Sequence, residues 1–262
     1  MKLNARKLAY LRELNTKKGR RQHSAFLATG VRVIREAISA NASIEFIGVA
    51  KSELSAAGKE LLESLKPYAL FEVSARDMRK LDASKTSQGL IAAIKMQPSE
   101  DESASGQRGP VLALDNLSDP SNVGSIIRSA LAFGFRRVLL SEGCVELYSP
   151  KVLRSSAGGV FHLELFPDCD LVDELIKLRD LDFQIVGTAG NGSDISTISF
   201  DVERLCLIIG SEARGISPEV LALCAEVVKI PMSSSCESLS APVAAAIAMY
   251  EIAGRSRKEA ID

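Results

Sequence analysis

The chain has 262 residues, of which 46% are hydrophobic and 25% are charged, and its net charge is −1 at neutral pH. These values are ordinary for a globular protein and exclude a disordered or fibrous chain. No apolar run approaches the roughly 18 residues that cross a bilayer, and the basic N-terminal segment lacks the apolar centre of a signal peptide. We therefore expect a cytoplasmic protein with no membrane partner.

The first 25 residues are strongly basic, with eight Lys and Arg against one acid, Glu13. Such a run is typical of a solvated helix face, and it is also what a segment that follows RNA phosphates requires. Hydrophobic periodicity predicts helices near 4–14, 30–40 and 55–65 and strands at 44–49 and 90–95. Residues 1–96 are therefore expected to form a small α/β domain.

Residues 97–109 are polar and rich in Ser and acids, which is typical of a linker. From residue 110 to 262, continuous apolar runs alternate with helical patterns, which predicts a parallel sheet covered on both faces. The expected strands are 111–114, 137–140, 183–189, 205–210 and 227–231, and a closing helix is expected at 241–254. Ligands of such sheets bind beyond the carboxyl ends of the strands, so the loops after Leu114, Thr188, Gly210 and Pro231 are candidates for the site.

The five cysteines are Cys144, Cys169, Cys206, Cys224 and Cys236. They are odd in number, widely spaced and without a C-x-x-C pair, so we expect neither a disulfide framework nor a metal site.

Three segments on the candidate loops carry polar residues. Residues 118–135 begin a helix at Asp119 and Pro120, where free N–H groups and the helix dipole favour an anion. Arg128 follows within this helix, one turn after the small residues Gly124 and Ser125. An Arg stem lying along apolar surface would explain Arg128 equally well.

The second segment, 208–217, is a strand followed by a turn that holds Glu212 between two glycines. The third, 230–251, is a strand, a serine-rich loop and an apolar helix opened by Pro242. Taken singly, these are an ordinary strand-to-helix connection and a flexible loop.

In this order, the three segments resemble the three motifs of the SpoU (TrmH) family of RNA ribose 2′-O-methyltransferases, within the SPOUT class. The similarity covers about residues 110–255 and rests on N-x-G-x-x-x-R, G-S-E-x-R-G, and I-P-M followed by S-L. Residues 26–38 and 81–94 are similar to the ribosomal-protein-like RNA substrate-binding domain that many of these enzymes carry.

The resemblance implies an α/β fold with a C-terminal parallel-sheet domain tied in a deep trefoil knot, a homodimer, S-adenosylmethionine as cofactor and RNA as substrate, with ribosomal RNA favoured over transfer RNA. The cofactor residues that it implies are Thr188, Gly210, Ile230, Met232 and Leu239. The catalytic residues that it implies are Asn122, Arg128, Glu212, Ser238 and Ser240.

A ribose 2′-hydroxyl must lose its proton as it attacks the methyl group, so the site needs alignment and stabilisation of the oxyanion. Neither histidine is placed to act as the base, since His23 lies in the basic segment and His162 in an apolar run expected to be a core strand. A guanidinium stays protonated, so we expect Arg128 to anchor phosphate and the developing alkoxide. Asn122 would orient the ribose and Arg128, and Glu212 would hold the arrangement together.

Two positions depart from the family pattern. Ser240 stands where the family usually has Asn, and Thr29 stands where the front domain commonly has an acid. Ser240 therefore keeps open an alternative, an RNA-binding relative of the same fold that has lost or weakened catalysis. A third reading, an unrelated nucleotide-binding α/β enzyme, would need a phosphate loop or dinucleotide fingerprint, and the sequence has neither.

Overall fold

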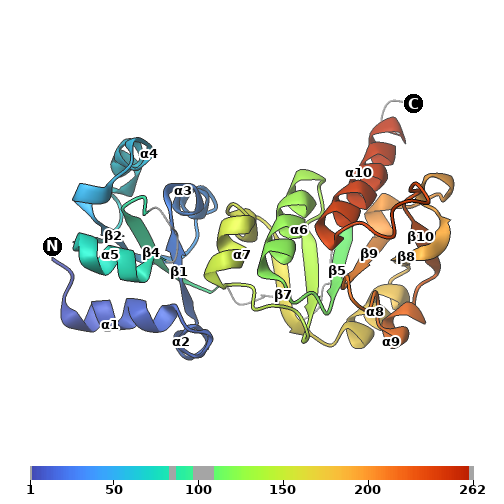
Figure 1. Cartoon of the computed structure of the whole chain (residues 1–262), viewed down its shortest axis with the longest axis horizontal. Helices are drawn as coiled ribbons and strands as arrows, with labels where there is room; N and C mark the ends of the chain where they lie inside the picture. Colours follow the sequence, from blue (N-terminus) through green and yellow to red (C-terminus); the bar gives the residue numbers. More distant parts are fainter. Residues whose placement is uncertain (1, 83–86, 97–108, 260–262) are drawn as a thin grey trace. The chain divides into compact units, whose positions relative to one another are not determined.

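Figure 1 shows a computed structural model that describes residues 2–82, 87–96 and 109–259. By its internal contacts the chain divides into two compact units. The first comprises Met1–Pro98 with Glu146–Phe161, and the second comprises Ser99–Val145 with His162–Asp262. The predicted linker lies almost wholly outside the described residues, as do residues 83–86 of the second front-domain motif. The domain boundaries at residues 96 and 110 stay predictions.

A mixed sheet in the order β1-β4-β2-β3 forms the centre of the first unit. Strand β4 pairs antiparallel with β1 and β2, while β2 and β3 run parallel. The strands are β1 (Ala25–Thr29), β2 (Ile44–Val49), β3 (Leu70–Glu72) and β4 (Leu90–Lys95). The helices described in this unit are α1 (Ala5–Leu14), α2 (Lys17–His23), α3 (Val31–Ser39), α4 (Ala56–Leu61), α5 (Ala75–Leu81) and α7 (Pro150–Ser155).

The five elements predicted for this unit are confirmed as α1, α3, β2, β4 and α4, the last continued by a 3-10 turn over Leu62–Leu65. The sequence analysis missed α2, which has no apolar stripe to reveal it. It forms because the Thr16 hydroxyl accepts a hydrogen bond from the Gly19 N–H at 3.0 Å, and it ends at Ser24, whose φ of 46° turns the chain into β1.

The second unit is built on six strands that all pair in parallel, in the order β10-β8-β9-β5-β6-β7. These strands are β5 (Val111–Asp115), β6 (Arg137–Ser141), β7 (Glu164–Cys169), β8 (Gln184–Asp194), β9 (Leu205–Gly210) and β10 (Glu226–Lys229). The helices described here are α6 (Pro120–Ala132), α8 (Leu171–Asp180), α9 (Pro218–Leu221) and α10 (Ala241–Glu259). The predicted parallel sheet is confirmed, and its central strands β5 and β9 are buried along their length.

Two strand ends differ from prediction at the edge that carries the site. Strand β8 continues to Asp194, past the expected end at 189, because its last two residues pair with Val228 and Lys229 of β10. Strand β10 stops at Lys229, so Ile230 and Pro231 already belong to the following loop.

The expectation that His162 lies in a core strand was wrong. His162 is exposed and precedes β7, which is an edge strand with a single buried residue, Phe166. An edge strand has one neighbour only, so an apolar run does not bury all its residues there.

No helix among the described residues is long and apolar enough to cross a membrane. Nor do the described Cys, His, Asp and Glu side chains form a group of three or more that could hold a metal ion.

Residues 146–161 belong to the first unit although they lie between β6 and β7 in sequence. A buried ion pair joins them to α2: the Arg20 Nε lies 2.9 and 3.0 Å from the two carboxylate oxygens of Glu146. The same guanidinium donates to the Leu14 carbonyl at 2.9 Å, and only 5% of the Arg20 side chain is exposed. Arg20 therefore ties α1, α2 and the 146–161 segment together.

We predict that Arg20→Ala lowers the free energy of unfolding by about 3–5 kcal/mol, because it leaves the Glu146 carboxylate without its cation in a poorly hydrated place. Urea unfolding followed by circular dichroism measures the change. The control is Arg12→Ala, whose ion pair with Asp77 is half exposed and should contribute about 0–1 kcal/mol. Equal effects of the two substitutions would show that the Arg20 pair does not hold this unit together.

Candidate functional site

A cavity of about 280 Å³ opens beyond the carboxyl ends of β8, β9 and β10 in the second unit. It is lined by three loops and the start of α10: Thr188, Ala189, Gly190, Ile195, Ile209, Gly210, Ser211, Glu212, Gly215, Val228, Lys229, Ile230, Met232, Glu237, Ser238, Leu239, Ala241 and Ala244. All five residues expected to hold the cofactor are among them, although they come from segments far apart in sequence.

Backbone forms one wall of this cavity because the chain reverses sharply after β9. Ser211 and Gly215 bridge one another, and Gly215 adopts a φ of 68° that favours glycine. A side chain at Gly210 would place its Cβ 2.2 Å from the Gly215 carbonyl carbon. Glycine at 210 therefore lets the turn fold back and leaves peptide groups, not side chains, facing the cavity.

Apolar side chains form a second wall. Ile195, Ile209 and Val228 are each at most 3% exposed, so they are held in place by the packed sheet behind them. Thr188 is also fixed, since its hydroxyl donates to the Ile208 carbonyl at 2.9 Å. The carboxylates of Glu212 and Glu237 stand at the exposed rim. This arrangement suits a flat apolar ring that carries a positively charged tail.

Glu212 connects the parts of the site. Its Oε1 accepts a hydrogen bond from the Asn122 side-chain amide at 2.7 Å and another from the Ala241 N–H at 3.1 Å. Asn122 is held in turn at the start of α6, where the Asp119 carboxylate accepts from its backbone N–H at 3.1 Å. The ends of β5 and β9 and the first turn of α10 thus meet at one carboxylate.

The other three residues expected to be catalytic occupy different positions relative to Glu212. Ser238 lines the cavity, and Ser240 precedes α10, where its carbonyl accepts from the Ala244 N–H at 3.0 Å. Arg128 is exposed on α6, and its guanidinium makes no hydrogen bond or ion pair with another described residue. Six residues separate Arg128 from Asn122, about 240° around the helix, so the two do not share a face. The structure thus brings Asn122 and Glu212 together but does not join Arg128 to them.

Eleven of the eighteen lining residues were not among the predicted site residues, and Ile195 and Glu237 are two of them. Ile195 comes from the part of the chain just after the unpredicted end of β8, and nothing in its local sequence marked it. Glu237 carried a signal, since it is the single acid in the serine-rich loop.

Residues 109–250 match the model of the SpoU rRNA Methylase family, and residues 5–92 match that of the MRM3-like substrate binding domain. The chain belongs to the SpoU rRNA methylase family. Among its relatives, the uncharacterized tRNA/rRNA methyltransferase of Mycolicibacterium paratuberculosis is 32% identical over 77% of this chain and 69% of its own length. That of Mycobacterium tuberculosis is 32% identical over 72% of this chain. The match spans 61% of the length of the Mycobacterium tuberculosis relative.

The similarity to solved structures extends over the residues of both units. The SpoU methyltransferase AviRb from Streptomyces viridochromogenes, in complex with the cofactor AdoMet, superposes with a TM-score of 0.83 at 26% identity, covering 97% of this chain and 99% of AviRb. An RNA 2′-O ribose methyltransferase gives a TM-score of 0.83 at 29% identity, with 97% of each chain covered.

Cys236 lies in the exposed loop beside the cavity, whereas the other four cysteines are partly or fully buried. Burial raises the pKa of Cys144 and Cys206, and it raises the pKa of Cys169 and Cys224 to about 11. A thiol with a raised pKa stays protonated, and only the thiolate reacts with alkylating agents.

We therefore predict that iodoacetamide at about pH 8 labels Cys236 first, with labelling of the other cysteines increasing only as the pH rises through their raised pKa values. Mass spectrometry of tryptic peptides follows the time course, and Cys236→Ser serves as the control that should remove the fast phase. Rapid labelling of Cys169 or Cys224 at this pH would contradict the placement of these side chains.

Proposed function

We propose that the protein transfers a methyl group from S-adenosylmethionine to the 2′-hydroxyl of a ribose in structured RNA. The observation that carries this proposal is the cavity beyond the strand ends, with the hydrogen-bonded Asn122–Glu212 pair at its rim. Family membership supports methyl transfer, and the likeness to AdoMet-bound AviRb and to the RNA 2′-O ribose methyltransferase supports the donor and the acceptor.

The lining of the cavity fits S-adenosylmethionine. Ile195, Ile209 and Val228 offer an apolar wall to the adenine, and the peptide groups around Gly210 offer donors and acceptors to its edge. Thr188, Ile230, Met232 and Leu239 complete the enclosure. When bound, this cofactor supplies an electrophilic methyl group on a positively charged sulfur, and the rim carboxylates complement that charge.

The residues of the rim act on the RNA. The Asn122 amide, held by Glu212, orients the ribose so that its 2′ oxygen lies in line with the methyl group. The permanently charged Arg128 anchors the adjacent phosphate and stabilises the negative charge that develops on the 2′ oxygen. Ser238 contributes its hydroxyl at the cavity mouth.

Ser240 is the point at which catalysis could be weak. A hydroxyl is shorter than the amide that the family usually has here, so Ser240 reaches the ribose through a water molecule. The second candidate function, an RNA-binding relative without turnover, rests on this one position. The other four residues expected to be catalytic are all present, and for that reason we favour the enzyme.

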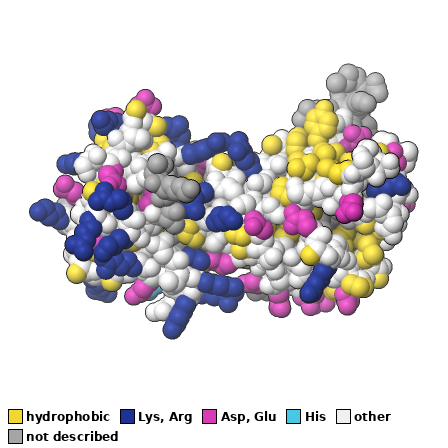
Figure 2. All heavy atoms as spheres, viewed as in Figure 1, with side chains coloured by type: hydrophobic (Ala, Val, Ile, Leu, Met, Phe, Trp, Pro, Cys, Tyr) yellow, Lys and Arg dark blue, Asp and Glu magenta, His cyan; other side chains and the backbone are white. Residues whose placement is uncertain are grey.

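The charge distribution supports RNA as the substrate. Residues 1–96 contain 18 Lys and Arg against 9 Asp and Glu, whereas residues 109–262 contain 13 against 21. Figure 2 shows the Lys and Arg side chains crowded over the first unit. Positive charge on the first unit attracts RNA phosphates whatever the base sequence. This suits the substrate-binding domain that residues 5–92 match. We favour ribosomal over transfer RNA, on the resemblance of this domain alone.

The test is transfer of labelled methyl from S-adenosylmethionine to unmodified total RNA, followed by nuclease mapping of the labelled ribose. We predict that Arg128→Ala lowers the rate by at least about a hundredfold, because it removes the charge that stabilises the alkoxide, while cofactor affinity changes less than about twofold. Arg136→Ala, an exposed Arg at the start of the neighbouring strand, is the matched control.

Turnover of Arg128→Ala at the wild-type rate would remove Arg128 from the mechanism. Absence of transfer by the wild-type protein to any RNA, with S-adenosylmethionine still bound in calorimetry, would favour the binding protein over the enzyme.

We also propose that the protein is a homodimer, joined through the exposed apolar face of α6 and α10. Val243, Ile247 and Tyr250 repeat at helical spacing and are 46%, 39% and 60% exposed. Tyr250 contacts Phe133 just after α6, with ring centroids 5.9 Å apart, and Leu131 of α6 is 38% exposed. Figure 2 shows hydrophobic side chains gathered over the C-terminal helix. Arg128 lies one turn before Leu131, so a dimer through this face would hold Arg128 at its interface.

We predict that the double variant Val243→Glu/Tyr250→Glu is monomeric, because two charges cannot be buried in an apolar interface without partners. Sedimentation velocity measures the mass. Leu181→Glu, at an equally exposed leucine after α8, should leave the dimer intact. A wild-type monomer at micromolar concentration would refute the dimer.

The deep trefoil knot is retained in this proposal. It rests on the family resemblance alone. The cytoplasmic location also stays a prediction.

A further inference from the structure

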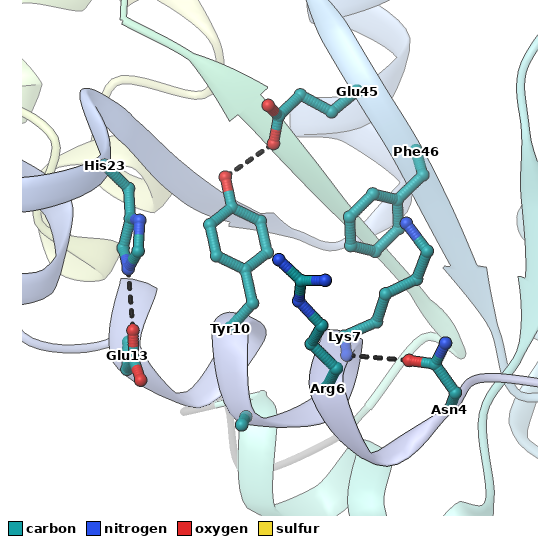
Figure 3. Close-up of a pocket in the computed structure, with 9 residues that line it drawn as sticks. Asn4, Arg6, Lys7, Tyr10, Glu13, His23, Glu45 and Phe46 are labelled. Atoms are coloured by element: carbon teal, nitrogen blue, oxygen red, sulfur yellow. Dashed lines mark hydrogen bonds and ion pairs between the residues drawn. The ribbon is translucent and has the colours of Figure 1, made fainter.

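A second hollow, of about 750 Å³, lies on the first unit and has no part in the methyl-transfer site. Figure 3 shows it between α1, the end of α2 and strand β2. Its lining combines aromatic, acidic and basic side chains: Asn4, Arg6, Lys7, Ala9, Tyr10, Glu13, His23, Glu45 and Phe46.

The ring of Tyr10 is held in one orientation within this hollow. Its hydroxyl donates to the Glu45 Oε2 at 2.5 Å, a contact between residues 35 positions apart. The His23 ring meets Tyr10 edge to face, with centroids 4.9 Å apart and planes at 84°. Burial and the nearby carboxylate raise the pKa of Tyr10, so the phenol keeps its proton and remains a donor. A fixed, partly exposed ring is a platform on which a flat base can stack.

Carboxylate oxygens lie beside this platform. The Glu13 Oε2 contacts the His23 Nε2 at 2.6 Å, and Glu45 uses Oε2 for Tyr10. The Glu45 Oε1 has no hydrogen-bond partner among the described residues, and its side chain is exposed. A carboxylate only accepts hydrogen bonds, so it pairs with a base edge that presents N–H groups.

Two cations, Arg6 and Lys7, lie in the lining of the hollow. Arg6 is exposed and extends alongside Tyr10 in Figure 3. Lys7 has another role, because its Nζ sits 4.3 Å and 4.7 Å from the ring centroids of Phe46 and Phe71 and thereby closes the floor of the hollow.

We propose that this hollow binds one unpaired guanine nucleotide of the RNA, with the base stacked on Tyr10, its N–H edge on Glu45 and its phosphate on Arg6. Guanine presents two adjacent donors, N1–H and N2–H. One pairs with the Glu45 Oε1, and the other pairs with the second lone pair of Oε2, which already accepts from Tyr10. The N3–H of uracil is instead flanked by carbonyl oxygens that a carboxylate repels. This inference rests on the proposed function, since it specifies which feature of the RNA the first unit recognises.

The experiment measures fluorescence anisotropy of the full-length protein with labelled single-stranded RNAs of sequence UUGUU, UUAUU and UUUUU at one fixed salt concentration. The expected result is that UUGUU binds about tenfold more tightly than UUUUU, the size of a good bidentate contact. Glu45→Gln keeps the shape of the side chain and should make the affinities for UUGUU and UUUUU similar. Tyr10→Ala should weaken UUGUU binding by about tenfold or more, while Tyr10→Phe, which keeps the ring, should lose much less.

Two substitutions outside the hollow are the controls, Tyr68→Ala and Glu60→Gln, and thermal unfolding of each variant verifies its fold. Equal affinity of the wild-type protein for the three RNAs, or wild-type affinity in Tyr10→Ala, would overturn the proposal. Methyl transfer by the same wild-type preparation is scored separately. Methyl transfer without guanine preference refutes the proposed guanine site and leaves the proposed methyltransferase activity standing. Guanine preference without methyl transfer refutes the proposed activity and leaves the guanine site standing.

Discussion

The hydrogen bonds to one carboxylate oxygen organise the second unit's site. Glu212 Oε1 receives the Asn122 amide from the start of α6 and the Ala241 N–H from the start of α10. These are the free N–H and side-chain groups of two helix starts, where the helix dipoles favour a negative charge. Because each helix follows a different strand, this one side chain joins three segments of the chain beside the cavity.

The cavity depends on glycine for a related reason. At Gly210 the turn over residues 211–215 returns so closely that a Cβ would overlap its backbone, and at Gly192 the extended end of β8 approaches β10 in the same way. Both contacts are between backbones, so the peptide groups that line the cavity are positioned by the sheet itself. Recognition built on peptide groups needs no nucleotide-binding fingerprint, and the sequence has none.

The sequence predicted the central strands well because parallel strands covered on both faces are continuous apolar runs. It failed where tertiary contacts override local pattern. Strand β8 continues over the polar residues 190–194 because β10 pairs with them, and this extension leads to Ile195 at the cavity wall. Helix α2 has no apolar stripe and depends on the cap at Thr16. The grouping of residues 146–161 with the first unit had no local signal either, since Arg20 and Glu146 are 126 positions apart.

For the site, the family resemblance named five cofactor residues that all line the cavity, and it named Asn122 and Glu212, which the structure joins by a hydrogen bond. It could not place Arg128 relative to them. Within one chain Arg128 is exposed and points away from the face of α6 that carries Asn122. Glu212, Ser238 and Ser240 are exposed too. Attack on a sulfonium by an alkoxide requires that water be excluded, because water would solvate the developing charge and compete for the methyl group. If the protein acts as proposed, the exposed rim must be covered to exclude water, and Arg128 must be brought to the ribose. RNA bound at the rim, together with a second copy of the chain on the apolar face of α6 and α10, meets both requirements.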